Sequence, residues 1–371
     1  MASMYEKICS WDNLLIAHRK ASRGKRGRQA AAVFEYKLAD NLLALQHELE
    51  SRTYLPGAYN SFIIHDPKRR RISAAPFRDR VVHHALCNLI EPVFESSFSA
   101  ASYANRVAKG THRALARAQA LSRRFCYVLQ FDVEQFFPAV DHRILRGILA
   151  RKIDDPDVMW LIDRILASGI GILGSEYTMR RFPGDTEDDD LRQRGLPIGN
   201  LTSQFWANCY LNPFDHFVKR ELRCQGYVRY VDDALAFADD KRALLIWRDA
   251  IVQRLASLRL TIHPGAHARP TREGFPFLGF VVYPAYKRLK RRKALVYRRR
   301  LKELIAGWVA GEISKECVLA SLRGWINHVR YGDTWGLRKS MLTHLPKICG
   351  GEPCNPIRWS SSPEPTTSSP G

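Results

Sequence analysis

The sequence predicts an α+β fold in which amphipathic helices alternate with short apolar strands. The chain has 371 residues, 46% of them hydrophobic, so it can bury a large core. By length it suggests two domains, or one domain with an appended module. Apolar residues recur at helical spacing in most long segments, whereas runs such as CYVLQFDV (126–133) are rich in β-branched and aromatic residues, as buried strands are.

The first 140 residues predict mainly helices. Residues 1–60 are expected to be helical, with one helix over 33–50. A basic, strand-like stretch then runs through Pro76 into a helix that ends near residue 94, and a helix at 111–124 precedes a strand at 125–137. The apolar faces of the first two named helices are Val33, Leu38, Leu42, Leu45 and Leu49, and Val82, Leu86, Leu89 and Ile90.

The remaining elements follow the same alternation. Asp141 is expected to cap the N-terminus of an amphipathic helix, and a Gly/Pro turn at 195–200 leads into a helix that reaches residue 218. Strand-like runs flank two adjacent aspartates within YVRYVDDALAF (227–237). The last expected elements are a helix at 241–257, a strand at 275–284, a basic helical module from 287 to about 345, and a disordered end at 360–371.

The charge of the chain predicts a polyanionic partner. The formal net charge is +21, which is unfavourable to pack unless nucleic acid or an anionic surface offsets it. No amphipathic anchor accompanies the basic clusters, so no membrane partner is expected. Residues 18–28 hold six Lys/Arg, which suits a mobile basic loop that either binds phosphate or is simply solvated, and 287–302 hold ten Lys/Arg.

Other features predict a soluble intracellular protein. No apolar run is long enough to span a bilayer, and the first 25 residues lack the pattern of a secretion signal, so a cytoplasmic location is expected. The eight cysteines form no CxxC pair and are interpreted as reduced core residues. The acidic segment GDTEDDD (184–190) is interpreted as a solvated loop and not as a metal site.

Three aspartates form the candidate catalytic set. Asp232 and Asp233 lie side by side in an apolar context, and Asp132 lies near the end of another predicted strand. Three converging carboxylates would repel by about 4 kcal/mol per pair at about 4 Å and an effective dielectric near 20, so a cation must lie between them. Hard oxygen ligands select Mg²⁺, and two such ions can serve an attacking hydroxyl and a departing pyrophosphate. The alternative is that Asp232 and Asp233 only form a hairpin turn.

Four blocks, in the same order, resemble the reverse transcriptase family over roughly residues 60–345. They are RRRISAAPFRDRVVHHALCNLIEPVF (69–94), FDVEQFF (131–137), YVDD (230–233) and FLGF (277–280). The resemblance implies a right-hand polymerase with an N-terminal helical extension (1–60), fingers and palm with an antiparallel sheet (61–285) and a basic helical thumb (286–345). Residues 346–371 would form a disordered tail.

The resemblance also implies site roles. Asp132, Asp232 and Asp233 would be catalytic and hold two Mg²⁺ ions together with the backbone carbonyl of Val133. Residues implied to bind the dNTP are Lys68, Arg69 and Arg71 at the triphosphate, Phe137 beneath the sugar, Ile198 and Gly199. Phe137 is alternatively an ordinary core residue. Residues implied to bind the template–primer are Phe277, Leu278, Gly279, Lys290, Arg291, Arg292, Arg298 and Arg299.

The block GLPIGNLTSQ (195–204) points to a subclass. Ile198 and Gln204 replace the glutamine and proline that most relatives carry, which is similar to the reverse transcriptases of diversity-generating retroelements. That resemblance implies cDNA with errors opposite template adenines, and a small basic accessory protein that assembles as a ring. Ile198 can make only apolar contacts, so a misplaced base pair should be penalised less. The alternative is that Ile198 serves core packing alone.

The chain departs from the family pattern before FLGF. The usual lysine, which can protonate the departing pyrophosphate, is absent between Leu260 and Phe280. His267 or Arg269 would take its place, His267 being the better proton donor near neutral pH.

Two other functions stay open. The chain could be the reverse transcriptase of a group II intron or a retron, although no maturase extension is recognisable after the thumb and the IGNLTSQ block disfavours a retron. It could also be a basic RNA-binding protein that has lost its chemistry, although that function predicts broken acids and all three aspartates are present.

Overall fold

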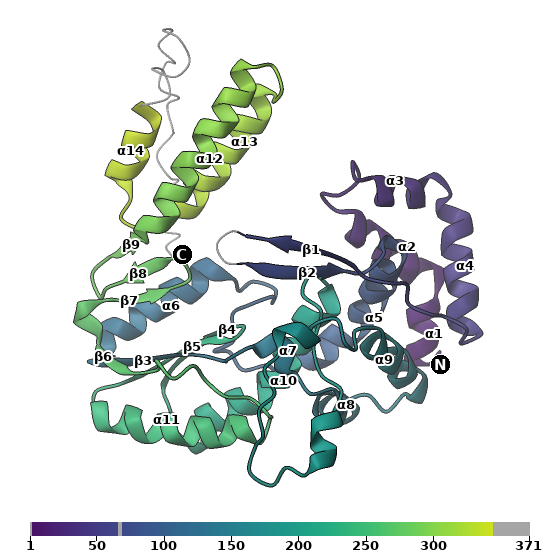
Figure 1. Cartoon of the computed structure of the whole chain (residues 1–371), viewed down its shortest axis with the longest axis horizontal. Coiled ribbons are helices and arrows are strands. Elements are labelled where there is room, and N and C mark those ends of the chain that lie inside the picture. The colour runs from purple at the N-terminus through teal and green to yellow at the C-terminus, as the bar shows by residue number, and fades with distance from the viewer. Residues whose placement is uncertain (1, 66–68, 344–371) are drawn as a thin grey trace, which may run out of the picture. The chain divides into compact units, whose positions relative to one another are not determined.

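The computed structural model describes residues 2–65 and 69–343. The chain divides into two compact units, Met1–Phe275 with Tyr283–Ala285, and Pro276–Val282 with Tyr286–Gly371. Figure 1 shows the helices and strands of the two units. The fold mixes helices and strands, as predicted.

The first unit begins with four helices, α1 (Met4–Cys9), α2 (Trp11–Ser22), α3 (Gln29–Tyr36) and α4 (Leu38–Glu50). The prediction of a single helix over 33–50 is wrong. The chain leaves helical geometry at Lys37, where φ is −119° and ψ is 50°. Leu42, Leu45 and Leu49 are fully buried as predicted. Val33 is 65% exposed, since the break separates its helix from the face that the leucines share.

These helices gather beside α5 (Phe77–Glu95), which follows the hairpin of β1 (Asn60–Ile64) and β2 (Arg70–Ala74) (Figure 1). The predicted apolar face of α5 is confirmed at Val82, Leu86 and Ile90, which are fully buried. Leu89 is only partly buried against the same core.

A four-stranded sheet lies at the centre of the first unit. Its order is β4 (Gly226–Tyr230), β5 (Asp233–Ala238), β3 (Tyr127–Asp132), β6 (Ala268–Pro270), and all neighbours are antiparallel. Leu129 and Phe131 belong to the main core, which α10 (Leu201–His216) and α11 (Lys241–Ala256) complete. In Figure 1, α11 runs along one side of this sheet.

The predicted helix over 111–124 and the predicted helix start at 241 are confirmed. The strand expected over 125–137 ends at Asp132 instead, because Gln135 turns the chain with φ of 47° into a short helix. Asp141 caps α8 as predicted, by accepting a hydrogen bond from the backbone N–H of Ile144. The remaining helical elements are α6 (Thr111–Arg124), α7 (Phe136–Ala139), α8 (His142–Ala150), α9 (Pro156–Ser168), a π-helical turn (Phe217–Glu221) and 3₁₀ turns at Gly174–Glu176, Glu187–Leu191 and Thr271–Glu273.

Up to residue 343, the second unit contains a small sheet and three helices. The strand β7 (Phe275–Phe277) leads into it and is followed by β8 (Phe280–Val282), β9 (Lys287–Leu289), α12 (Arg291–Val309), α13 (Lys315–Val329) and α14 (Trp335–Thr343). The single strand expected over 275–284 is instead two strands, because Leu278 and Gly279 turn the chain with φ of 45° and 90°. Leu301, Ile305, Val318, Leu322 and Met341 form the core of the helices.

Two composition-based expectations concern cysteines and membranes. The six cysteines in the described ranges are free thiols, and Cys9, Cys87, Cys209 and Cys224 are buried, as predicted. Cys126 and Cys317 are exposed. Among residues 2–65 and 69–343, no helix is both long enough and apolar enough to cross a membrane.

Candidate active site

The pairing of β3 with β5 brings the predicted catalytic acids together. Asp132 lies directly opposite Asp233, and the N–H of Val133 donates to the carbonyl of Asp232 at 3.2 Å. Asp232 occupies the tight turn between β4 and β5, after Val231, whose φ is +58°. Acids that are distant in the chain therefore meet at one edge of the sheet.

The electrostatics confirm that two of these carboxylates are close. Burial, and then the negative charge of Asp132, raise the pKa of Asp232 to about 6, while Arg70 and Arg229 oppose that rise. Asp233 accepts a hydrogen bond from Gln130 Nε2 at 3.2 Å. Asp132 and Asp232 thus form a pair whose ionised states repel, with Asp233 held beside them.

A buried ion pair stabilises the turn between β4 and β5 that carries Asp232. Arg229 pairs with Asp215 of α10 at 2.6 Å, and both side chains are at most 2% exposed. Arg229 Nη1 also donates to the carbonyl of Val231 at 2.9 Å, and Tyr227 donates to Asp215 at 2.9 Å. Because its hydrogen-bonding groups are engaged, the pair can be accommodated in the core and fix the backbone that carries Asp232.

The end of β3 is also held from its other side. His263 donates its N–H to the carbonyl of Asp132 at 3.0 Å, and Glu134 donates to the carbonyl of Thr261 at 2.9 Å. Val133 forms an antiparallel bridge with Ile262 between these two bonds. The backbone around Asp132 is therefore clamped by segments on both sides.

The loop 195–200, which contains the IGN sequence, joins β2 to the segment after Asp132. Ser73 donates its N–H to the carbonyl of Ile198 at 2.8 Å, and the Asn200 side chain accepts from Ala75 N–H and donates to the Ser73 carbonyl. Leu196 donates to the carbonyl of Phe137 at 2.8 Å. The Ile198 side chain is half-buried.

Gly199 is needed for this close approach. Its φ is +122°, and a Cβ there would lie 2.9 Å from Cγ2 of Ile72. A side chain at this position would therefore be strained and would push β2 away from the loop.

Phe137 is half-buried, with its ring centroid 5.3 Å from that of Phe136 and nearly edge-on to it. It packs against the main core and lies one backbone hydrogen bond from the loop that carries Ile198. This position is compatible with both roles predicted for Phe137, contact with the sugar and packing in the core.

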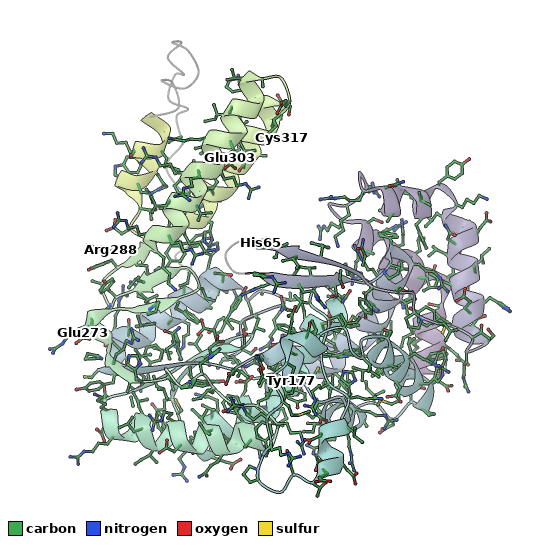
Figure 2. All side chains as sticks on the ribbon, in the orientation of Figure 1. His65, Tyr177, Glu273, Arg288, Glu303 and Cys317 are labelled. Atoms are coloured by element: carbon green, nitrogen blue, oxygen red, sulfur yellow. The ribbon has the colours of Figure 1, made fainter. Side chains whose placement is uncertain are left out.

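The cations of the β1–β2 hairpin are placed differently from one another. The hairpin is described up to His65 (Figure 2) and again from Arg69, which is exposed, while Lys68 lies outside the described residues. Arg71 donates to the carbonyl of Ile172 at 3.2 Å and lies 3.8 Å from Glu176. Its guanidinium is thus engaged with the segment after α9.

Arg70 is the cation that the sequence analysis missed. Its charge lowers the pKa of Asp232, so it lies near the acids. Alternate residues of a strand point to opposite faces, so Arg70 shares a face with Ile72, which contacts Gly199, whereas Arg71 points away. The alternation separates Arg70 from Arg71, but which of the two faces lies toward the acids follows from the fold and not from the spacing.

His267 directly precedes β6, whose Ala268 pairs with Leu129 of β3. It is exposed, with Nδ1 at 2.7 Å from the carbonyl of Gly265 and Nε2 at 3.0 Å from Arg269 Nη2. The two residues proposed to replace the missing lysine therefore contact each other.

The predicted template–primer residues belong to the second unit. Phe277 is fully buried, and Leu278 and Gly279 form the turn between β7 and β8. Lys290 is half-buried and donates its N–H to the carbonyl of Gly279 at 3.0 Å. The other four predicted residues, Arg291, Arg292, Arg298 and Arg299, are among the exposed cations of α12.

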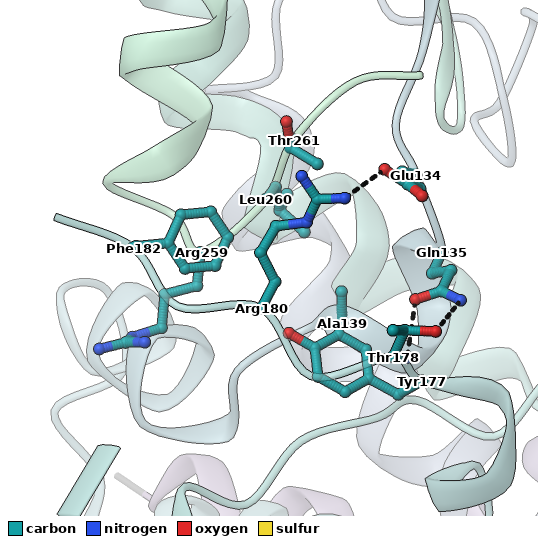
Figure 3. Close-up of a pocket in the computed structure, with 10 residues that line it drawn as sticks. All are labelled: Glu134, Gln135, Ala139, Tyr177, Thr178, Arg180, Phe182, Arg259, Leu260 and Thr261. Atoms are coloured by element: carbon teal, nitrogen blue, oxygen red, sulfur yellow. Dashed lines mark hydrogen bonds and ion pairs between the residues drawn. The ribbon is translucent and has the colours of Figure 1, made fainter. Parts of the chain in front are cut away.

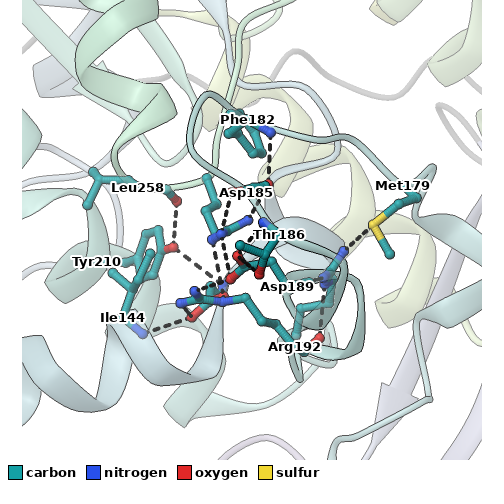
Figure 4. A network of polar contacts seen from close by, with 12 residues as sticks. Ile144, Met179, Phe182, Asp185, Thr186, Asp189, Arg192, Tyr210 and Leu258 are labelled. Atoms are coloured by element: carbon teal, nitrogen blue, oxygen red, sulfur yellow. Dashed lines mark hydrogen bonds and ion pairs between the residues drawn. The ribbon is translucent and has the colours of Figure 1, made fainter.

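The acidic segment 184–190 is not the fully solvated loop that was expected. Asp185 pairs with Arg259 and its side chain is only 7% exposed, and Asp189 pairs with both Arg259 and Arg192 at 2.9 Å (Figure 4). Arg192 also binds the buried Asp141 at 2.6 Å. Arg259 is distant in sequence, so composition alone could not reveal this network.

A small recess lies behind the residues that follow Asp132 (Figure 3). It is partly open to solvent, with an empty volume of about 240 Å³, and its walls include Tyr177 and Leu260. Across it, Arg180 pairs with Glu134 at 2.9 Å, and Thr178 N–H donates to the Gln135 side chain at 3.0 Å. The connection 169–194 is therefore anchored to the segment that carries the first acid.

The acids fit a hard divalent cation. Within 2–65 and 69–343, no three His, Cys, Asp or Glu side chains are grouped as metal ligands, so the expected convergence of all three aspartates is not found there, and the Asp132–Asp232 pair with nearby backbone oxygens would supply the donors. Two repelling, partly buried carboxylates are the oxygen-rich setting that Mg²⁺ occupies.

Comparisons with known proteins identify the family of the chain. Residues 65–282 match the family model described as "Reverse transcriptase (RNA-dependent DNA polymerase)". The chain is 28% identical to Protein YkfC of Escherichia coli (strain K12) over 194 residues, which are 50% of this chain and 47% of that protein. It is 26% identical to Group II intron-encoded protein LtrA of Lactococcus lactis subsp. cremoris over 176 residues, 46% of this chain and 27% of LtrA.

The chain therefore spans about half, or less, of the length of these curated relatives. Among solved structures, telomerase from Candida albicans in complex with a TWJ fragment of telomeric RNA is similar, with a TM-score of 0.43 and 12% identity. That match covers 79% of this chain and 62% of the telomerase chain.

The raised pKa of Asp232 predicts a pH-dependent stability. The folded state holds this proton more tightly than the unfolded state, so ionisation of Asp232 destabilises the fold as pH rises from 3.8 through about 6. In EDTA at pH 7, Asp232→Asn should therefore raise the unfolding free energy, by on the order of 2–3 kcal/mol. Below pH 3.8 the gain should vanish.

Urea unfolding at both pH values measures this difference. Asp163→Asn is the matched control, because the Asp163 side chain is 41% exposed and pairs only with Arg146 at the surface. A gain from Asp232→Asn that is equal at both pH values would show that charge repulsion is not its cause.

Proposed function

The chain belongs to the reverse transcriptase family, and we propose that it is an RNA-directed DNA polymerase of a diversity-generating retroelement. In this proposal it copies a template RNA into cDNA that carries errors opposite adenine. The observation that carries the catalytic part is the meeting of Asp132, at the end of β3, and Asp232, in the turn between β4 and β5, in one partly buried pair. The family match, which covers both acids, supports it.

The acids and the nearby backbone would hold the catalytic ions. Asp132 and Asp232 would bind two Mg²⁺ with the carbonyl of Val133, and Asp233 would support them. Bound Mg²⁺ supplies activation of the primer 3′ hydroxyl and charge neutralisation at the departing pyrophosphate. The Arg229–Asp215 pair and the His263 and Val133 hydrogen bonds hold the two acid-bearing segments in fixed register.

The hairpin cations and the loop would position the incoming nucleotide. Of the predicted set Lys68, Arg69 and Arg71, the last is engaged with Ile172 and Glu176, so we assign the triphosphate contact nearest the acids to Arg70. Phe137 would lie beneath the sugar and exclude a 2′-hydroxyl. His267 would donate the proton to pyrophosphate after its Nε2, which accepts from Arg269 in this structure, is released from that contact and protonated.

The proposal includes the polymerase layout inferred from the sequence. The N-terminal extension would cover 1–60, fingers and palm 61–285, and the thumb 286–345, while the tail at 346–371 lies outside the described residues. Template RNA and the RNA–DNA hybrid would contact the turn at Leu278 and Gly279 and the exposed arginines of α12. Their phosphates would make binding strongly salt-dependent. A small basic ring-forming protein would assist.

The subclass rests on Ile198. Its backbone is fixed to Ser73 while its side chain is half-buried, so an apolar side chain is presented from a rigid loop joined to Phe137. Such a side chain cannot hydrogen-bond a nascent base pair, which supports weaker discrimination against mismatches.

A second candidate function is reverse transcription within a group II intron. It is favoured by the similarity to LtrA, which is named as a group II intron-encoded protein. The two functions differ in the errors of their cDNA and in the neighbouring DNA, where a diversity-generating element carries two near-identical repeats that differ mainly at adenines of one copy.

The catalytic assignment predicts that Asp232→Ala abolishes dNTP incorporation on a primed RNA template with Mg²⁺. Loss of several kcal/mol of charge stabilisation should lower the rate by about 10³-fold. Asp163→Ala should retain wild-type activity, because Asp163 lies at the surface away from the sheet. If wild type and Asp232→Ala are equally inactive even with accessory protein and cognate RNA, the catalytic proposal fails.

The strand alternation predicts different effects for neighbouring arginines. Arg70→Ala should raise the KM for dNTP by roughly 10- to 100-fold, since a charged hydrogen bond is worth about 1.5–3 kcal/mol. Arg71→Ala should change KM little, because Arg71 binds Ile172 and Glu176. Steady-state kinetics of both variants test this, and a larger KM effect at Arg71 would reverse the assignment.

The subclass predicts that Ile198→Gln lowers misincorporation opposite template adenine, because the new amide can hydrogen-bond the nascent pair. Sequencing of the cDNA made by wild type, Ile198→Gln and the apolar control Ile198→Leu measures this. An error spectrum that is the same in all three removes the role proposed for this side chain.

A further inference from the structure

We propose that α2 and the turns after it form a binding surface for the phosphate backbone of RNA, outside the region that matches the reverse transcriptase family. We call this surface the α2 basic face and define it as Arg19, Lys20, Arg23, Lys25, Arg26 and Arg28. The family match begins at residue 65, so nothing in it assigns this surface. That the anion is RNA rests on the proposed function.

The α2 basic face surrounds an open recess. The recess has an empty volume of about 950 Å³ and is lined by Arg19, Lys20, Arg23 and Arg26 together with Ile16 and Gly24. All six cations of the face are exposed. A broad, open, cationic hollow suits an extended polyanion better than an enclosed small molecule.

The segment is built as a series of turns, not as the loose loop that the sequence suggested. Helix α2 continues through Ser22, and the N–H groups of Lys25 and Arg28 donate to the carbonyls of Ser22 and Lys25, each at 2.9 Å. Gly24 permits this with φ of +68°. Cations in the last turn of a helix favourably oppose its dipole, which accounts for Arg19 and Lys20, but Lys25, Arg26 and Arg28 lie beyond the helix.

Few carboxylates balance these cations. Arg26 lies 3.7 Å from Glu35, and the charge of Lys20 acts on Glu91, but Lys20 itself donates to the amide oxygen of Asn88 at 2.5 Å. Burial, and then Arg80, lower the pKa of Lys25.

His84 faces the same positive field. Burial, followed by Lys20 and Lys25, lowers its pKa to about 4, so it is neutral at physiological pH. Lys20 and Lys25 therefore disfavour a further positive charge beside the face, and a bound polyanion would offset the charge of its cations.

The face is held rigidly against α5. Asn13 of α2 donates to the carbonyl of Ala85 at 3.1 Å and accepts from Asn88 at 2.9 Å. The buried ring of His18 stacks on Phe34 of α3 at 5.8 Å and meets Phe77 of α5 edge-on at 6.0 Å. The backbone under the cations is therefore ordered before any ligand binds, which reduces the entropy lost on binding.

The test measures how RNA binding depends on salt. Arg19→Gln/Arg23→Gln removes two exposed charges from the face of the full-length protein, and Lys241→Gln/Arg242→Gln removes two exposed charges from the start of α11. Binding of a single-stranded RNA of mixed sequence is followed by fluorescence anisotropy at several salt concentrations. The assay contains neither dNTP nor divalent cation, so failure of the polymerase proposal would leave it unaffected.

The expected result is a shallower salt slope for Arg19→Gln/Arg23→Gln, by about 0.7 for each RNA phosphate that the variant no longer neutralises. Lys241→Gln/Arg242→Gln should keep the wild-type slope, and Arg19→Lys/Arg23→Lys should restore most of it. Equal slopes for the two glutamine variants would overturn the proposal, because only net charge would then matter. Loss of binding to phosphatidylserine vesicles with an unchanged RNA slope would also overturn it, in favour of a membrane surface.

Discussion

The arrangement of the candidate active site depends on the buried ion pair between Arg229 and Asp215. Two charges in a core destabilise it unless their hydrogen-bonding groups are satisfied, and here Tyr227, Asn208 and the Val231 carbonyl complete the set. The pair ties a long helix to the strand that precedes the turn. Val231 adopts a positive φ in this turn. Asp232 can therefore lie beside Asp132 of β3.

This constraint places the negative charges of Asp132 and Asp232 close together, so the surrounding residues determine how far their repulsion is offset. Burial and Asp132 raise the pKa of Asp232, and Arg70 and Arg229 offset only part of that effect. Elsewhere the chain pairs its buried acids directly, as Asp141 does with Arg192 and Asp185 with Arg259. The Asp132–Asp232 pair differs from these two in that the largest influence on the pKa of Asp232, after burial, is another negative charge.

Local patterns in the sequence predicted much of this structure. The cap at Asp141, the helices at 111–124 and from 241, and the strands around the aspartates depend on neighbouring residues, and they are confirmed. The break at Lys37 was not foreseen, since no glycine or proline marks it. The pairing of the acidic segment with Arg259 and the contrast between Arg70 and Arg71 depend on residues brought together by the fold, so spacing alone could not give them.

The residues of the loop at 195–200 have different structural roles, and these roles determine which of them can be exchanged during evolution. Gly199 and Asn200 hold the loop backbone against β2. Gly199 permits the close approach because it lacks a Cβ, and the Asn200 side-chain amide donates to the Ser73 carbonyl. Ile198 contributes its carbonyl to the same contact, and any amino acid supplies a carbonyl. Selection can therefore exchange the side chain at this one position while the hydrogen bonds that hold the loop against β2 stay the same.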